Sequence, residues 1–225
     1  MTNEILKITL PMPLRMGTTN CYLIQNPNGK FLIDTGGSNN EKMLELEMEK
    51  AGCSPEKLSL IIITHGDFDH TGNAAFLKNK FGVKIAMHPD DAAMAEKGDM
   101  FVNRKKPNFL IQTLVPLFTG FGKSRRFKPD ILLKDGDTFS GHGLDARVIS
   151  IPGHSKGSIG ILLSNGELFC GDLLVNTKEP ALSTLMDDQS AASSSMMRLQ
   201  HEAIQMVYPG HGEPFDFSVF HLKTE

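Results

Sequence analysis

Two histidines and two aspartates lie within six consecutive positions of this 225-residue chain, in the segment THGDFDHTG at residues 64–72. They are His65, Asp67, Asp69 and His70. Imidazole and carboxylate groups are ordinary ligands of zinc, iron and manganese. Because alternate residues of an extended chain share a face, His65 and Asp67 should point to one side, and the following turn can aim the other two elsewhere. The spacing predicts two adjacent metal positions, and the alternative is a polar loop with helix-capping residues.

Four further short motifs accompany this segment. The turn at residues 34–36 reads DTG, residues 151–158 read IPGHSKGS, residues 170–172 read CGD, and residues 208–212 read YPGHG. In this order the motifs resemble those of the metallo-β-lactamase superfamily, whose signature is His-x-His-x-Asp-His, followed at a distance by a histidine, an aspartate and a last histidine. The resemblance runs from about residue 20 to about residue 215 and leaves out only an insertion at about residues 98–130.

The resemblance implies seven metal ligands in two sets that share one bridging residue. The sets are His65, Asp67 and His154 for one metal, Asp69, His70 and His211 for the other, and Asp172 for both. An aspartate can bridge in this way because its two oxygens can span metals about 3.5–4 Å apart. Asp69 and Asp172 are the predicted catalytic residues.

Asp67 stands where the superfamily pattern has histidine. A carboxylate in place of a neutral imidazole favours harder ions, so iron(II) and manganese(II) are alternatives to the zinc that the resemblance implies. Flavodiiron proteins share the fold and carry glutamate there, but this chain has no room for their flavin-binding domain. If Asp67 does not bind, one tight and one loose metal remain. We expect two divalent metal ions and leave their identity open.

The implied activity is hydrolysis by a hydroxide that bridges the two metals. Metal coordination lowers the pKa of water toward neutrality, and the resulting hydroxide attacks an ester, thioester, lactone or phosphoester. The length and ligand set are most like those of the glyoxalase II and lactonase branches. One alternative is a di-iron oxidoreductase that needs an external electron donor, which iron content and redox-sensitive absorption would distinguish. The other is a non-catalytic ligand-binding member of the fold.

Strand and helix patterns alternate around these motifs. The apolar, β-branched run LSLIIIT at residues 58–64 predicts a strand covered on both faces, and it ends at His65. Asn165-Gly166 predicts a hairpin turn. Other strands are expected at residues 4–10, 21–26, 30–34, 83–88, 131–139 and 145–154, and helices at residues 39–51, 72–81 and 189–205. Strands followed by helices occur twice, which predicts an α/β fold: a four-layer αβ/βα sandwich of two mixed β-sheets with helices outside.

The insertion at about residues 98–130 differs from the rest of the chain in charge. Residues 97–128 contain eight basic side chains and one acid, Asp99, a local balance of 8 − 1 = +7 in a chain of net charge −3. Between the basic clusters, an apolar stretch is expected to form a lid that selects an anionic, partly apolar substrate. A helical hairpin that packs on the core or on a dimer partner is an equal alternative. The predicted lid residues are Phe109, Leu114, Phe118 and Phe121.

Composition excludes several other classes. The net charge gives no overall attraction for nucleic acid, and the longest uncharged run, sixteen residues between Lys106 and Lys123, is too short to span a bilayer. The three cysteines form no CxxC pair, which argues against a disulfide framework, and the first residues lack a secretory signal. We therefore expect one domain over residues 1–225 that acts on a small molecule in the cytoplasm, with a homodimer as one option.

Two residues near the motifs have two interpretations each. Asp34 can orient the loop at residues 64–72 through a hydrogen bond, or it can serve only in its own turn. His88 follows a strand and can reach the cleft, but a structural histidine is the more common case. Neither residue is predicted to be catalytic.

Overall fold

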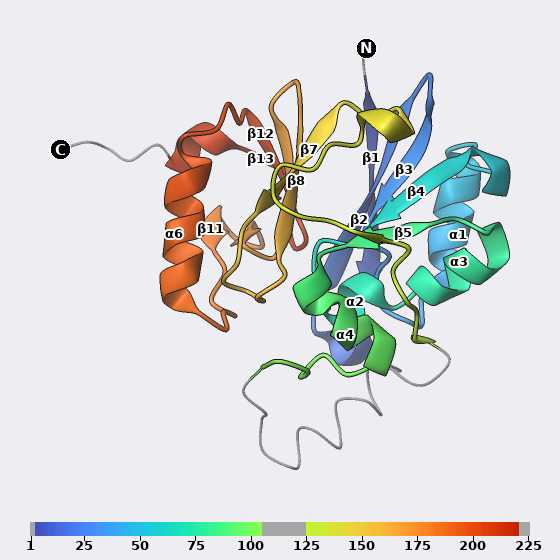
Figure 1. Cartoon of the computed structure of the whole chain (residues 1–225), viewed down its shortest axis with the longest axis horizontal. Helices are drawn as coiled ribbons and strands as arrows, with labels where there is room; N and C mark the ends of the chain where they lie inside the picture. Colours follow the sequence, from blue (N-terminus) through green and yellow to red (C-terminus); the bar gives the residue numbers. More distant parts are fainter. Residues whose placement is uncertain (1–2, 105–124, 221–225) are drawn as a thin grey trace.

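Two β-sheets face each other, and helices cover the outer side of each sheet (Figure 1). The computed structural model describes residues 3–104 and 125–220. Helix α6 (Gln189–Leu199) lies outside one sheet, and α1 (Glu41–Lys50) and α3 (Ala74–Phe81) lie outside the other. The central part of the predicted insertion falls outside the described residues, and so do all four predicted lid residues, Phe109, Leu114, Phe118 and Phe121.

The first sheet has six strands in chain order, β1-β2-β3-β4-β5-β6. The first three strands are antiparallel neighbours, and β3 to β6 run parallel. The parallel part needs crossovers, which the helices on the outer face supply. The strands are β1 (Glu4–Pro11), β2 (Thr18–Asn26), β3 (Gly29–Ile33), β4 (Leu58–Ile62), β5 (Ile85–Met87) and β6 (Ile131–Leu132).

The second sheet has five strands in the order β13-β12-β9-β8-β7. Neighbours are antiparallel except for β9 and β12, which are parallel, so the sheet is mixed like the first. Its strands are β7 (Ala146–Ser150), β8 (Ile159–Leu163), β9 (Glu167–Gly171), β12 (Met206–Pro209) and β13 (Phe215–Asp216). Two short strands, β10 (Leu174–Val175) and β11 (Ala181–Leu182), form a separate ribbon.

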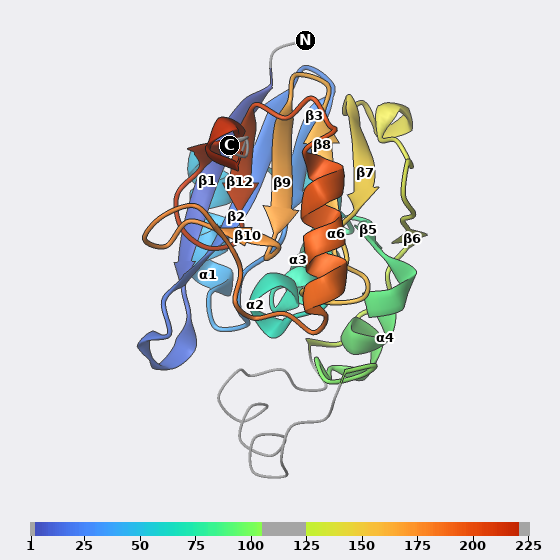
Figure 2. The same ribbon diagram turned by 90° about the vertical axis from the view of Figure 1, so that its left-hand side faces the viewer.

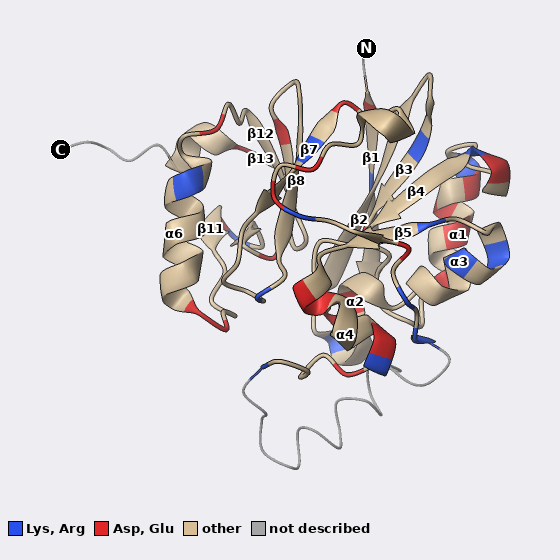
Figure 3. Ribbon diagram, in the orientation of Figure 1, with Lys and Arg blue, Asp and Glu red and all other residues tan. Residues whose placement is uncertain are grey.

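The remaining helical segments lie at the ends of strands. Helix α2 (Phe68–Thr71) is a single turn, and α4 (Pro89–Lys97) follows β5. Figure 2 shows α6 in front of the second sheet, and Figure 3 shows that acidic and basic residues are frequent along the outer helices α1 and α3. Short 3-10 turns occur at η1 (Pro13–Arg15), η2 (Pro55–Lys57), η4 (Ser140–His142) and η5 (Phe217–Phe220).

The hydrophobic core consists of three clusters, one at each interface between layers. On β4, Leu60 and Ile62 belong to the cluster between the sheets, whereas Ile61 belongs to the cluster under α1 and α3. On β8, Ile161 faces the other sheet and Leu162 packs toward α6. Because successive side chains point to opposite faces and both faces are covered, these strands are continuously apolar. The predicted four-layer α/β sandwich of two mixed sheets is confirmed.

None of the helices in the described part of the chain combines the length and the apolar character that crossing a bilayer requires.

Candidate metal centre

The predicted ligands come from loops that meet at one end of the two sheets. Strands β7, β9 and β12 run in the same direction, so their carboxyl ends lie at the same edge. His154 follows β7, Asp172 follows β9, and His211 follows β12. From the first sheet, β4 leads into the loop that carries His65, and α2 follows at this end of the molecule (Figure 1). The remaining three predicted ligands are Asp67, Asp69 and His70.

All seven predicted ligands come together, and six of them are buried. The exception, His211, is partly exposed, with 18% of its side-chain surface accessible. The four imidazole rings form a row, with centroids 4.6 Å apart for His154 and His65, 4.1 Å for His65 and His70, and 5.6 Å for His70 and His211. This row places several nitrogen and oxygen donor atoms close together.

Two groups of three potential ligand atoms stand out among the described residues. One group is His65, His154 and Asp172, and the other is Asp69, His70 and His211; within each group the atoms all lie within 4.8 Å of one another. Asp172 also reaches the second group. Its Oδ1 lies 3.2 Å from Nε2 of His70, and its Oδ2 lies 3.1 Å from Nε2 of His211. Asp172 therefore stands between the two groups, as the bridging role requires.

Each of the four histidines donates a hydrogen bond from Nδ1. His154 donates to the carbonyl oxygen of Leu185 and His211 to that of Thr18, both at 2.6 Å. His70 donates to a carboxylate, and His65 donates at 2.9 Å to the hydroxyl of Thr64. That hydroxyl gives its own hydrogen to a carboxylate, so it can only accept from His65. A neutral imidazole with its hydrogen on Nδ1 presents a lone pair at Nε2, so all four Nε2 atoms are available as metal ligands.

The atoms that face one another across the centre are mostly acceptors. Nε2 of His154 lies 2.9 Å from Oδ2 of Asp67, and two lone pairs at this distance need a cation or a proton between them. Three buried atoms of the predicted ligands have no hydrogen-bond partner among the described residues: Nε2 of His65, Nε2 of His70 and Oδ1 of Asp172. Buried polar atoms without partners are rare. The donor set therefore fits divalent cations.

Burial and charge act in opposite directions on the histidine pKa values. Burial disfavours the charged form of His154, but the hydrogen bond and charge of Asp67 outweigh it and raise the pKa to about 9. Burial is likewise outweighed at His211, where Asp172 raises the pKa to about 10. The pKa of His70 is also raised well above its ordinary value against burial, chiefly by Asp172. The metal-free centre therefore holds protons between its acids and rings.

His65 and the acids show the complementary shifts. Burial and the neighbouring rings of His70 and His154 lower the pKa of His65 well below its ordinary value. Burial raises the pKa of Asp67, but His154 lies against its carboxylate and brings the pKa below the usual range. The pKa of Asp172 is lowered in the same way, against burial, by His70 and His211. These acids are ionised at neutral pH and can act as ligands.

Asp34 has the orienting role that the sequence left open. Its Oδ1 accepts the backbone N–H of Thr64 at 2.8 Å, and its Oδ2 accepts both the Thr64 hydroxyl and Nδ1 of His70 at 2.8 Å. His88 instead has a structural contact, because its Nδ1 accepts the backbone N–H of Asp90 at the start of α4. The interpretation of His88 as a structural residue agrees with this contact.

Three further residues that were not found from the sequence hold either a predicted ligand or the loops that carry the ligands. Thr19 donates to Oδ2 of Asp69 at 2.9 Å, and Asp91 is a fully buried acid that joins the loops of His65 and His154. Arg104 contacts Oδ1 of Asp67. The only sequence signal for Asp91 is its place in the first turn of a helix, where acids are common.

Close packing of the centre depends on a glycine of the last motif. A Cβ atom at Gly210 would lie 2.2 Å from Oδ1 of Asp172 and 2.7 Å from Cε1 of His70. Any larger residue would displace these ligands, which explains the glycine next to His211.

Comparison with known families agrees with this geometry. The profile of the metallo-beta-lactamase superfamily matches residues 14–211, which include all seven predicted ligands. The chain belongs to the metallo-beta-lactamase superfamily. This membership confirms the family resemblance and, with the His and Asp groups described above, supports binding of divalent metal.

Individual similar proteins show how far the similarity extends. Hydroxyacylglutathione hydrolase GloC of Haemophilus influenzae is 27% identical over 72% of this chain and 70% of its own length. The uncharacterized protein YobT of Bacillus subtilis is 29% identical over 68% of this chain, and the match spans only 60% of YobT. The crystal structure of TTHA1623 in a di-iron-bound form superposes with a TM-score of 0.68 and 25% identity, over 92% of this chain and 94% of that one. Hydrolase chemistry is therefore supported for this superfamily member.

Proposed function

We propose that this protein is a dinuclear metal-dependent hydrolase that cleaves an acyl ester or thioester of a small molecule. The observation that carries the proposal is the convergence of four histidine Nε2 atoms and three aspartates on one buried centre, with Nδ1 of every ring already bonded. The thioester preference draws on the name of GloC, since hydroxyacylglutathione is a thioester. Lactones and phosphoesters are the other bonds that this chemistry can cleave.

The residues divide between two cations. His65, His154 and Oδ2 of Asp67 would hold one, Asp69, His70 and His211 would hold the other, and Asp172 would contact both. When bound, the two cations would supply Lewis acidity toward the substrate's carbonyl oxygen and would lower the pKa of water toward neutrality.

The protein's own groups fix the geometry and handle protons. The acceptors behind the rings hold each imidazole in one orientation and one tautomer, which increases its basicity as a ligand. Thr19 holds Oδ2 of Asp69, 3.4 Å from Nε2 of His211. We assign Asp69 and Asp172 the catalytic roles, with Asp69 as the carboxylate that accepts a proton during attack by water.

A direct test combines metal analysis with a panel of substrates. Protein purified without chelators should contain two equivalents of metal and should hydrolyse at least one of an acyl-glutathione thioester, a p-nitrophenyl ester, a lactone and a phosphodiester. Chelation should abolish turnover and added metal should restore it, while Asp172→Asn should lose at least about 100-fold in kcat/KM. Full metal content with no turnover on any of the four, or turnover that survives chelation, would contradict the proposal.

Iron chemistry is the second candidate. One observation favours it, the di-iron-bound form of the similar structure TTHA1623. An oxidoreductase would show two equivalents of iron and an absorption band that changes on chemical reduction. Colourless protein that hydrolyses esters with zinc alone would exclude it.

A further inference from the structure

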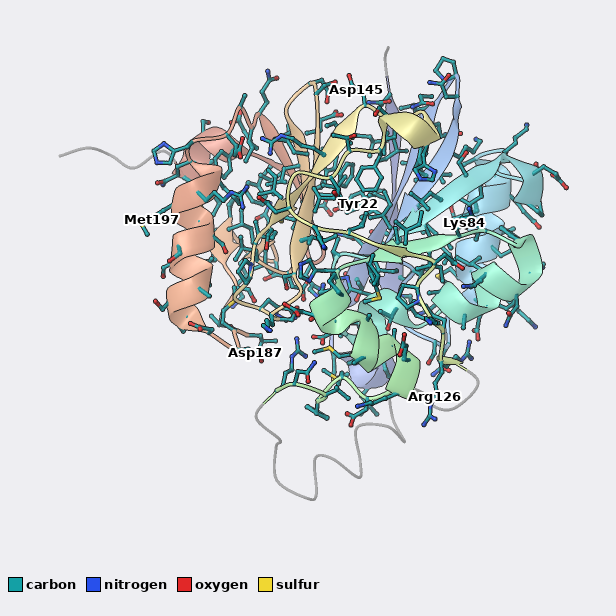
Figure 4. All side chains as sticks on the ribbon, in the orientation of Figure 1. Tyr22, Lys84, Arg126, Asp145, Asp187 and Met197 are labelled. Carbon is teal, nitrogen blue, oxygen red and sulfur yellow. The ribbon has the colours of Figure 1, made fainter. Side chains whose placement is uncertain are left out.

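Asp67 is bound on one side by a buried arginine. The Arg104 side chain is only 8% exposed, and its Nη1 donates to Oδ1 of Asp67. Its Nε donates to Oδ2 of Asp187 at 2.6 Å, and its Nη2 donates to the carbonyl oxygen of His154 at 3.3 Å. Asp187 lies at the same end of the molecule (Figure 4). The guanidinium therefore occupies one oxygen of Asp67 and fixes the plane of the carboxylate.

The other oxygen of Asp67 faces the histidines. Oδ2 lies 2.9 Å from Nε2 of His154 and 3.8 Å from Nε2 of His65. With Oδ1 held by Arg104, Asp67 can offer a cation one donor atom and not two. A histidine at this position, as in the superfamily signature, would also offer one donor atom.

The Asp67–Arg104 pair also resembles a histidine in its net charge. A carboxylate carries −1 and a guanidinium +1, so the buried pair has the net charge of a neutral imidazole. The second acid on the arginine, Asp187, has 41% of its side-chain surface exposed, and solvent screens it. The positive charge of Arg104 therefore mainly offsets the negative charge of Asp67.

We propose that Arg104 makes Asp67 equivalent to a histidine, with one donor atom and no net charge, and that this pair keeps the metal preference of the centre toward zinc. The inference rests on the metal-binding part of the proposed function. It opposes the simpler expectation that an aspartate at this position favours manganese(II) or iron(II). Without Arg104, the carboxylate would regain its full charge and its second oxygen, and both favour harder cations.

A control is needed to separate the proposed effect of Arg104 on metal preference from a purely structural role. The arginine also joins the loop at Asp187 to the rest of the site, so its removal can loosen that loop. Asp187→Asn is the matched control, because it weakens the same link and leaves the Arg104–Asp67 contact in place.

The experiment uses the full-length chain and four variants: Arg104→Met, Asp67→His, the double variant Asp67→His/Arg104→Met, and Asp187→Asn. Each metal-free protein is titrated with zinc and with manganese against a chromophoric chelator, metal content is counted, and thermal unfolding checks the fold.

Arg104→Met should lower the zinc-to-manganese affinity ratio at least tenfold. Asp67→His removes the buried carboxylate that offsets the charge of Arg104 and should weaken zinc binding. The double variant should bring the ratio back to within threefold of the starting protein, and Asp187→Asn should leave it unchanged.

Each contrary outcome is decisive. The inference is overturned if Arg104→Met folds and its zinc-to-manganese affinity ratio stays within threefold of that of the starting protein. It is also overturned if the ratio falls as much in Asp187→Asn as in Arg104→Met. If Arg104→Met does not fold, the double variant decides, because it must fold and prefer zinc if histidine alone replaces the pair. Starting protein that takes up neither metal removes this inference together with the proposed function. Protein that binds zinc and follows this pattern but hydrolyses nothing supports the inference and contradicts only the hydrolase proposal.

Discussion

His70 donates from Nδ1 to Oδ2 of Asp34 over 2.8 Å, and Asp34 also binds Thr64, so this carboxylate joins the ends of two strands to helix α2. Asp34 directly follows β3, its other partner Thr64 lies just beyond β4, and His70 belongs to α2. All the atoms involved are buried. One carboxylate thus sets the orientation of His70 and also holds the Thr64 hydroxyl that orients His65, so both ligand groups depend on it.

Asp34→Asn should therefore weaken metal binding more than it weakens the fold. An amide has one acceptor oxygen, so either Thr64 or His70 would face an NH2 group in place of an oxygen. We expect metal affinity to fall by about 10–100-fold, as for other partners of metal ligands. Chelator competition measures this loss, and the exposed Asp145→Asn serves as the control. Equal affinities for the two variants would show that Asp34 serves only its own turn.

Metal uptake should release protons. The pKa values of His154 and His211, raised to about 9 and about 10, together with that of His70, also raised, mean that the metal-free centre is protonated at neutral pH. Metal needs neutral imidazoles, so roughly three protons should leave per filled centre at pH 7. Isothermal titration in buffers of different ionisation enthalpy counts them. A binding enthalpy that does not vary with the buffer would contradict this protonation state.

The same shifts give the metal-free protein a pH-dependent stability. A histidine whose folded pKa is raised binds its proton more tightly in the folded state than in the unfolded chain, where the pKa is about 6.5. The stability contributed by His154 and His211 is therefore complete below about pH 6.5 and is lost as the pH rises through 9 and 10. Thermal unfolding of chelator-treated protein between pH 6 and pH 10 should show a falling Tm, and a rising Tm would contradict the sign.

The three cysteines should be inert in the folded protein. Cys21, Cys53 and Cys170 are free and buried, and burial raises the pKa of each thiol, that of Cys170 to about 12. Thiolate is the reactive form, so a disulfide reagent at pH 8 should label almost none of the native protein. In guanidinium chloride all three should react. Rapid labelling of the native chain would show that one of these interior segments opens.

The sequence predicted those features of the fold and of the site that depend on residues near one another in the chain. The apolar run at residues 58–64 and the ligand segment that follows it were readable because strand period and motif spacing are local properties. The strand expected at residues 131–139 shortens to Ile131–Leu132, because Lys134 donates its N–H to the side chain of Asp137 in a turn. The helix expected at residues 189–205 ends at Leu199. Boundaries such as these depend on competing local hydrogen bonds.

Arg104 and Asp91 could not be identified from the sequence for a different reason. Arg104 is 37 positions from Asp67, and Asp91 is 64 positions from Ser155. No spacing rule connects residues that far apart; only the packing of the loops brings them together. The metal preference expected from Asp67 alone therefore left out Arg104, whose positive charge offsets that of the carboxylate.

Asp91→Ala should be among the most destabilising changes near the centre. Asp91 accepts the backbone N–H of Gly66 at 2.8 Å, the hydroxyl of Ser155 at 2.6 Å and the backbone N–H of Gly157 at 2.9 Å. Alanine would leave the two backbone N–H groups without an acceptor in a buried site, and each such group costs about 1–3 kcal/mol, whereas the Ser155 hydroxyl can still pair with that of Ser158. We expect a loss of about 3 kcal/mol or more in the free energy of unfolding, measured by urea titration of metal-free protein.

The adjacent acid provides the control for this prediction. Asp90 precedes Asp91 on α4, but its side chain is 38% exposed and lies 3.4 Å from the exposed amine of Lys156. Exposed ion pairs contribute about 0–1 kcal/mol, so Asp90→Ala should change the stability little. Because Asp91 joins the loops that carry His65 and His154, Asp91→Asn should also weaken binding at that ligand group relative to the Asp69–His70–His211 group. Equal losses for Asp90→Ala and Asp91→Ala would show that the buried contacts of Asp91 contribute nothing beyond those of a surface acid.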